Sequence, residues 1–420
     1  MSSPPKKEAA PAGNVFQFTL VGLVVFSLAL IAAASFISYK LAAINRPKPS
    51  DFFMVNPNDK SQSVHDGPWG TLTERKIQLE WPVEYVMDDV SKPKPEVWNF
   101  DGLDTGAVKA LLAKNGLTAA QAAAACAPNC IREEKSGTVL TPSADFLLSL
   151  DAATRGRLYT ALAGQKISLN FDYPFIFPGD SIEPIYRDKR LDPDDVRLLK
   201  RLVYDNGGTW QLSNYQLLIS QIPTADRRVA MARSLSRQSA VFAGLVITPG
   251  TDIDKLASYW GNVPNVRITN IRPLMEALKT LPEGGNLSLF YLLPKLARDR
   301  LYTYPLPQQP GDPIMDCLWT TFNFSSDTPE NRFNDPGFAA QFIQKNYYQI
   351  SAPSQYGDIL LLMNNNKIEH SAVFLADDLV FTKNGKDYRE PWILMHIPDL
   401  LATYPASPPL KPVYMRLKTE

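Results

Sequence analysis

A cysteine and a histidine in the C-terminal part of this 420-residue chain stand in settings that suit thiol chemistry. Cys317 follows Asp316 and opens the run Leu-Trp-Thr-Thr-Phe-Asn-Phe, which predicts a helix with the cysteine at its first position and the aspartate as its N-cap. The amino end of a helix favours an anion, here a thiolate. His370 opens an alternating apolar stretch and could take the proton of the thiol. The pair predicts a nucleophile and its base.

A thiol hydrolase also needs a group that orients the imidazole and donors that stabilise the oxyanion. Asn384 is our first choice for the orienting role, because an amide oxygen can accept the ring N–H, and Thr382 is the second. They lie fourteen and twelve residues after His370, and even offsets on a regular strand point to one face. For the oxyanion we expect the backbone N–H of Cys317 and the hydroxyl of Tyr304.

Three elements must position these residues. The helix that begins at Cys317 is followed by a buried strand, Tyr356-Gly-Asp-Ile-Leu-Leu-Leu-Met, and then by a hairpin that starts at His370. Strands separated by turn residues predict a small antiparallel sheet. The sequence therefore predicts a C-terminal α+β domain over residues 301–420.

This order of motifs resembles the NlpC/P60 superfamily of papain-like cysteine hydrolases, known mostly as cell-wall peptidases and amidases. The resemblance covers about a quarter of the chain, near residues 300–400, and rests on Asp316-Cys317, Gly357-Asp358-Ile359 and His370-Ser-Ala-Val-Phe. It implies cleavage of an amide bond in a peptide or peptidoglycan-type substrate of the cell envelope.

The chain departs from the family at two positions. The family commonly has Asp-Cys-Ser-Gly, whereas Leu318 and Trp319 follow the cysteine here. The third polar residue of the family is usually His, Asn or Gln at the spacing that Thr382 occupies. A family tyrosine about a dozen residues before the cysteine often lines the site, and Tyr304 stands thirteen before Cys317.

The N-terminal region predicts a membrane anchor. Residues 14–39 carry no charge and are almost wholly apolar from 18 to 37, and about 20 such residues span a bilayer as a helix. A cleaved signal peptide is the alternative, although its apolar core is usually shorter, roughly 7–15 residues. We expect a cytoplasmic tail over 1–13 and a bilayer contact through 14–39.

The basic flanks of this segment do not decide its orientation, since they are nearly balanced. They are Lys6 and Lys7 on one side and Lys40, Arg46 and Lys48 on the other. A local disulfide between Cys126 and Cys130 would suit an exported location, while two buried thiols are the alternative. We expect a single-pass membrane protein with the bulk of the chain in the periplasm or otherwise outside the cytoplasm.

Between anchor and hydrolase-like domain, the sequence predicts an extended tether over 40–100 and a mainly helical domain over 101–300. Amphipathic stretches that predict helices occur at 103–115, 118–127, 194–203, 224–242 and 270–281.

Other function classes find no support in the sequence. Lysine plus arginine equals aspartate plus glutamate at 43 each, so no net charge favours nucleic acid. Nucleotide-binding loops, His-Glu-x-x-His and Gly-x-Ser-x-Gly are absent, and no cofactor is implied. No metal site is expected, because a zinc site at Cys126 and Cys130 lacks two further ligands nearby.

Three functions therefore remain open. The first is the cysteine hydrolase. The second is a catalytically inactive envelope scaffold with the same fold, whose helical domain would contact another envelope protein. The third is a thiol acyltransferase working at the membrane.

Overall fold

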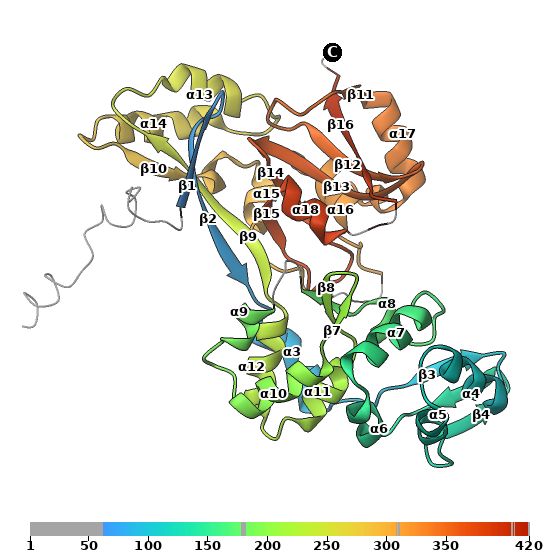
Figure 1. The fold of residues 1–420 in the computed structure, drawn as a ribbon. Coiled ribbons are helices and arrows are strands. Elements are labelled where there is room, and N and C mark those ends of the chain that lie inside the picture. Colours follow the sequence, from blue (N-terminus) through green and yellow to red (C-terminus); the bar gives the residue numbers. More distant parts are fainter. Residues whose placement is uncertain are drawn as a thin grey trace, which may run out of the picture. The chain divides into compact units, whose positions relative to one another are not determined.

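The computed structural model describes residues 62–418 except 178–181, 308, 310, 405 and 407, and it leaves the side chains of residues 88 and 89 undescribed (Figure 1). The chain divides into two units, 1–56 and 57–420, and every described residue belongs to the second. The predicted tail over 1–13, the predicted anchor over 14–39 and the first part of the tether lie outside the described residues.

The prediction of a single-pass membrane protein is wrong for the part of the chain that the structure describes. Within it, no helix has the length and apolar character needed to cross a bilayer. Its longest α-helix, α14 (Ile268–Lys279), has 12 residues, whereas a membrane-spanning helix needs about 20.

The predicted fold class is also wrong, because helices do not dominate. The described chain is mixed α/β and builds four sheets whose strand pairs are all antiparallel. Several of their strands fall within 101–300, where the sequence predicts a mainly helical domain. Residues 224–242, predicted as one helix, divide between α12 (Ala225–Leu235) and the strand β9 (Gln238–Ile247).

A long strand pair explains this error. β2 (Gly70–Leu79) runs antiparallel to β9, from Thr71 opposite Val246 to Leu79 opposite Gln238. The pair joins residues more than 150 positions apart, so no local pattern announces it. β1 (Gln62–Gly67) and β10 (Gly285–Ser288) complete this sheet in the order β1-β2-β9-β10.

Residues 80–237 therefore form an insertion between two paired strands, and they have a core of their own. Every buried residue of one apolar cluster comes from 81–235, with Trp98 packed among the rings of Phe146, Tyr159 and Phe171. Cys126 and Cys130 lie in this insertion as two free, buried thiols.

The helices of the insertion are α3 (Val83–Ser91), α4 (Thr105–Lys114), α5 (Ala119–Ala125), α6 (Ala144–Ser149), α7 (Ala152–Leu162), α8 (Leu169–Asp172), α9 (Glu183–Tyr186), α10 (Pro193–Leu202), α11 (Tyr215–Gln221) and α12. Its two small sheets are β3-β5-β4, from β3 (Trp98–Asp101), β4 (Ile131–Glu134) and β5 (Gly137–Leu140), and β6-β8-β7, from β6 (Phe175–Phe177), β7 (Tyr204–Asn206) and β8 (Thr209–Leu212).

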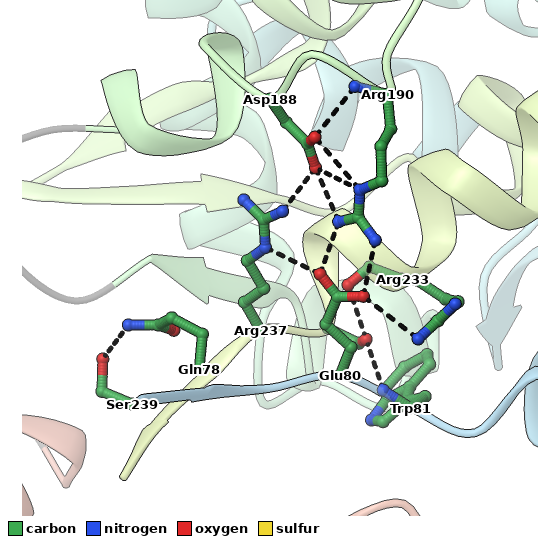
Figure 2. A network of polar contacts seen from close by, with 9 residues as sticks. Gln78, Glu80, Trp81, Asp188, Arg190, Arg233, Arg237 and Ser239 are labelled. Atoms are coloured by element: carbon green, nitrogen blue, oxygen red, sulfur yellow. Dashed lines mark hydrogen bonds and ion pairs between the residues drawn. The ribbon is translucent and has the colours of Figure 1, made fainter. Parts of the chain in front are cut away.

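A network of ion pairs lies where the chain enters and leaves the insertion (Figure 2). The Glu80 carboxylate contacts the guanidinium groups of Arg190, Arg233 and Arg237, and Asp188 contacts Arg190 and Arg237. Hydrogen bonds from Arg190 and Arg237 outweigh burial and hold the pKa of Glu80 below its usual value. This network of charges ties the end of β2 to the α9–α10 loop and to the end of α12.

The C-terminal sheet has six strands in the order β11-β16-β12-β13-β14-β15. They are β11 (Tyr347–Ile350), β12 (Ile359–Asn364), β13 (Lys367–Ala376), β14 (Leu379–Lys383), β15 (Trp392–His396) and β16 (Lys411–Leu417). Alternate residues of β13 and β14 belong to different clusters: Val373 and Phe381 pack with Trp319, whereas Ala372 and Val380 pack with Leu400. Both faces of these central strands are therefore covered, which accounts for their nearly continuous apolar sequence.

Helices around this sheet carry the candidate residues. α16 (Cys317–Phe322) packs against β13 and β14, and α18 (Ile397–Thr403) packs against β15 (Figure 1). The remaining elements are α13 (Ile253–Trp260), η1 (Leu289–Leu292), α15 (Lys295–Arg300), η2 (Asn331–Asn334) and α17 (Pro336–Asn346).

Candidate active site

Cys317 occupies the first position of α16, and the predicted cap is confirmed. The Asp316 carboxylate accepts a hydrogen bond of 2.9 Å from the backbone N–H of Trp319. Asp316 is buried, and Cys317 is half-buried. The side chain of Cys317 packs beside Leu318 and Phe322 in an apolar cluster at this end of the sheet.

The thiol of Cys317 is held in its protonated form. Burial raises its pKa to about 11, and the neighbouring Asp316 carboxylate adds to the shift. Hydrogen bonds from Ser371 act in the opposite direction and do not offset the burial. In this arrangement the dipole of a six-residue helix does not suffice to make a thiolate at neutral pH.

His370 lies in β13 with no exposed surface. Its Nε2 is 2.7 Å from the Thr382 hydroxyl oxygen, whereas its Nδ1 is buried and has no hydrogen-bond partner among the described residues. Burial lowers the pKa of His370 to about 3, so the ring is neutral at pH 7. His370 therefore differs from a core histidine whose two ring nitrogens are both hydrogen-bonded. Leaving a buried polar atom without a hydrogen bond costs roughly 1–3 kcal/mol of folding free energy.

Tyr404, just after α18, covers the imidazole of His370. The two ring centroids are 4.4 Å apart and the planes are inclined by 28°, which is a stacked arrangement. Tyr404 also lies close enough to Cys317 for the two to interact electrostatically. The tyrosine therefore links the surroundings of the histidine to those of the thiol.

The structure does not join Cys317 to His370 by a hydrogen bond. The thiol is instead hydrogen-bonded to Ser371, and the Ser371 hydroxyl donates a hydrogen bond of 2.9 Å to the Thr321 hydroxyl of α16. Adjacent side chains of a strand point to opposite faces, so Ser371 faces α16 while His370 faces Tyr404. A β-bulge lies beside this point, since His370 pairs with Leu362 and Ile368 with the next residue of β12. Such bulges shift which residues face a given side of a sheet.

The other predicted site residues lie apart from this pair. Asn384 follows the end of β14, and its side-chain nitrogen lies 3.6 Å from the Met395 sulfur, while its side-chain oxygen has no hydrogen-bond partner in the described part of the chain. The structure thus places Thr382, the second choice, at the imidazole. Tyr304 packs against the core of the insertion and edge-on to Tyr85, and its buried hydroxyl has no hydrogen-bond partner among the described residues. No contact connects it to Cys317 within the described chain.

Lys383 is a further buried group near the thiol that the sequence reasoning missed. Its ammonium donates to the backbone oxygens of Gly385 and Asp387 at 2.8 and 2.9 Å. Burial lowers its pKa to about 8, and Glu390, Asp387, Asp316 and Cys317 act in the opposite direction. Burial likewise raises the pKa of Glu390 to about 7. The surroundings of Cys317 thus contain an ammonium group that gives up its proton more easily than an ordinary lysine does.

A local signal existed for only some of the missed residues. Ser371 follows His370 directly, and Lys383 lies between the two candidates for the orienting role, so both were within reach of sequence reasoning. Tyr404 is 34 residues beyond His370 in a segment without a motif, and only the packing of α18 brings it to the ring. Across the described residues, no group of three or more His, Cys, Asp or Glu side chains is arranged to hold a metal ion.

Comparisons with known proteins add no relative, because no family model, no curated protein and no solved structure matches the chain.

Proposed function

We propose that the chain is a cysteine hydrolase of amide bonds, of the peptidase or amidase type, whose site is closed at rest. The observation that carries the proposal is the His370 ring: Thr382 contacts Nε2, and Nδ1 is buried without a hydrogen-bond partner among the described residues, on the strand β13 against which the helix of Cys317 packs. We assign the ring proton to Nε2, donating to the Thr382 oxygen, which leaves the lone pair on Nδ1. This is the tautomer that a proton acceptor requires.

The chemistry follows from these roles. The Nδ1 atom of His370 takes the proton of the Cys317 thiol while the sulfur attacks the carbonyl carbon of the amide. The imidazolium returns the proton to the nitrogen as the C–N bond breaks, and water hydrolyses the resulting thioester. The backbone N–H of Cys317, at the first position of α16, can donate to the oxyanion. A peptide or peptidoglycan-type amide is the substrate class that the resemblance implies.

Closure explains the electrostatics. With Tyr404 stacked on the ring, burial keeps both His370 and Cys317 neutral, and the two side chains form no hydrogen bond with each other. Displacement of the tyrosine would admit water to the imidazole, restore its basicity and let it turn toward the thiol.

The inactive scaffold is the second candidate, favoured by one specific observation. A thiol with a pKa near 11 that bonds to Ser371 rather than to His370 is the state of an inert packed cysteine. The two candidates differ in what happens when the ring is uncovered.

The decisive experiment uses the full chain with Tyr404→Ala. The rate of iodoacetamide alkylation at Cys317 is followed against pH by mass spectrometry of the modified peptide. We expect the rate at pH 7.5 to rise about ten-fold or more, and the rise to vanish in Tyr404→Ala/His370→Ala, because positioned general bases contribute about 10²–10⁴-fold. The matched control is Tyr414→Ala, which removes a tyrosine of the same apolar cluster without ring stacking on His370.

Product analysis then tests the reaction. Tyr404→Ala should release peptides from purified peptidoglycan or cleave soluble peptides, and Cys317→Ala in the same background should not. Lipid or peptide acyl donors with an added amine distinguish transfer from hydrolysis. Slow alkylation in Tyr404→Ala, unchanged by His370→Ala and without product, would establish the scaffold instead.

A further inference from the structure

A second site lies away from the thiol and is built from positive charge. Five residues line a pocket of about 250 Å³, drawn from the α13–α14 connection, from α15 and from the loop after α16. They are Asn265, Arg267, Lys295, Arg298 and Asp327. Three are cations and one is an anion, so the lining carries an excess of two positive charges.

The two arginines are uncompensated. Neither Arg267 nor Arg298 forms an ion pair or a side-chain hydrogen bond with another described residue, although most arginines of the described chain have a carboxylate partner. Lys295, by contrast, pairs with Asp299 of its own helix. Guanidinium groups without partners on one concave surface raise the local potential and attract a counter-anion.

The walls of the pocket are held by the core, which fixes the positions of these charges. In the α13–α14 connection Val263 precedes the pocket residues and Val266 stands between them, and Leu296 and Ala297 stand between the two cations of α15. All four pack into the same apolar cluster. The cations therefore project from backbone segments that cannot separate without opening that core.

Asn265 lines the pocket and is hydrogen-bonded to the loop after α16. Its backbone is in the left-handed region with φ of 63°, and its side-chain amide donates to the backbone oxygen of Ser325 at 2.7 Å. Arg267 is the N-cap of α14, and no side chain caps this 12-residue helix. The amino end of α14 therefore adds its partial positive charge at the rim.

We propose that this pocket binds a phosphate dianion, either inorganic phosphate or the phosphomonoester group of a small organic phosphate. Two forked guanidinium groups match the oxygens of a phosphate, and the charges of the two unpaired arginines are opposite in sign to those of its dianion. A pocket of about 250 Å³ suits one such head group rather than a polymer. The site goes beyond the hydrolase and does not depend on it.

The test is calorimetric titration of the full-length protein with inorganic phosphate at low salt and pH 7.5. We expect saturable binding that weakens about ten-fold or more in Arg267→Gln and in Arg298→Gln, because a charge-assisted hydrogen bond contributes roughly 1.5–3 kcal/mol. Arg187→Gln is the matched control, since this arginine is 81% exposed, pairs with Glu183 and lies in the insertion. Binding of inorganic phosphate should also weaken as the pH falls below neutrality, because the dianion then takes up a proton.

Phenyl phosphate and succinate complete the design. Tighter binding of phenyl phosphate than of phosphate identifies an organic phosphomonoester as the ligand, and the reverse identifies free phosphate. Binding of succinate equal to that of phosphate would overturn the proposal, as would the absence of saturable heat. Equal phosphate binding by all three glutamine variants would overturn it too, and thermal unfolding checks that each variant is folded.

Discussion

Two histidines of the C-terminal part occupy opposite environments. His370 is fully buried beside the Thr382 hydroxyl and the Tyr404 ring, and burial lowers its pKa. His396 is partly buried, its Nδ1 lies 2.6 Å from the Asp378 carboxylate, and this hydrogen bond raises its pKa. The surroundings thus favour the neutral form of the imidazole in one region and its charged form in the other.

The charged region extends around a buried carboxylate. Glu74 is 3% exposed, and the Nε2 atoms of His396 and His65 lie 3.5 and 3.7 Å from one of its oxygens. Asp377 contacts the other ring nitrogen of His65 at 3.0 Å. Each imidazole here lies between two carboxylates, whereas the contacts of the His370 ring within the described chain are with a hydroxyl and an aromatic ring. The difference teaches that the neighbours, and not the strand position, decide which histidine can serve as a base.

The first prediction concerns the sign of pH dependence at His370 and is the largest effect expected. The folded-state pKa of about 3 lies below the unfolded value of roughly 6.5, so the unfolded chain binds the extra proton between these values. Stability from the neutral ring is present above pH 6.5 and is lost as pH falls, by up to about 1.4 kcal/mol per pH unit.

Urea unfolding of wild type and His370→Gln between pH 4 and 6.5 measures this slope. The variant should lose the contribution, so the free-energy difference between the two proteins should shrink toward low pH. His396→Gln is the control and should leave the slope in this window nearly unchanged. A constant difference between wild type and His370→Gln would mean that the imidazole is already charged in the fold.

The second prediction separates the orienting hydroxyl from a structural one. Thr382→Val removes the partner of His370 Nε2, whereas Thr320→Val removes the acceptor of the Trp392 indole N–H, 3.0 Å away. Both threonines are fully buried, so each change should cost about 1–3 kcal/mol in urea unfolding. In a Tyr404→Ala background, only Thr382→Val should slow alkylation of Cys317, because only this change removes the hydroxyl that fixes the tautomer of His370. Equal slowing by both would reduce Thr382 to a packing residue.

The sequence predicted the parts of this region that depend on neighbours along the chain. The cap of α16 by Asp316 was predictable because a cap joins residues only three positions apart. The strand after Gly357 was predictable from its continuous apolar sequence. The sequence could not decide between Thr382 and Asn384, and the reason is also local. Parity alone cannot separate two even offsets, and β14 ends at Lys383, which leaves Asn384 beyond the strand.

The rest depends on contacts between distant segments. The pairing of β2 with β9 turned the last part of a predicted helix into a strand, and the bulge beside His370 decides which face of the sheet the ring lies on. Tyr404 reaches the imidazole only through the packing of α18. These features determine that Cys317 and His370 are not hydrogen-bonded to each other in the structure, and no sequence motif predicts them.

The third prediction tests the charged region and is the smallest effect. Because Asp378 raises the pKa of His396 above its unfolded value, the stabilisation is full below about pH 6.5 and is lost as pH rises through the raised pKa. Asp378→Asn should therefore destabilise the protein at pH 6 by less than about 1 kcal/mol, since Asp378 is 42% exposed, and the loss should fade at alkaline pH. Asp254→Asn is the matched control: its partner Arg272 does not titrate, so its small effect should stay constant from pH 6 to 9. Thermal unfolding at several pH values gives both curves. Parallel curves would remove the contrast between the two histidines, because His396 would then be as neutral as His370.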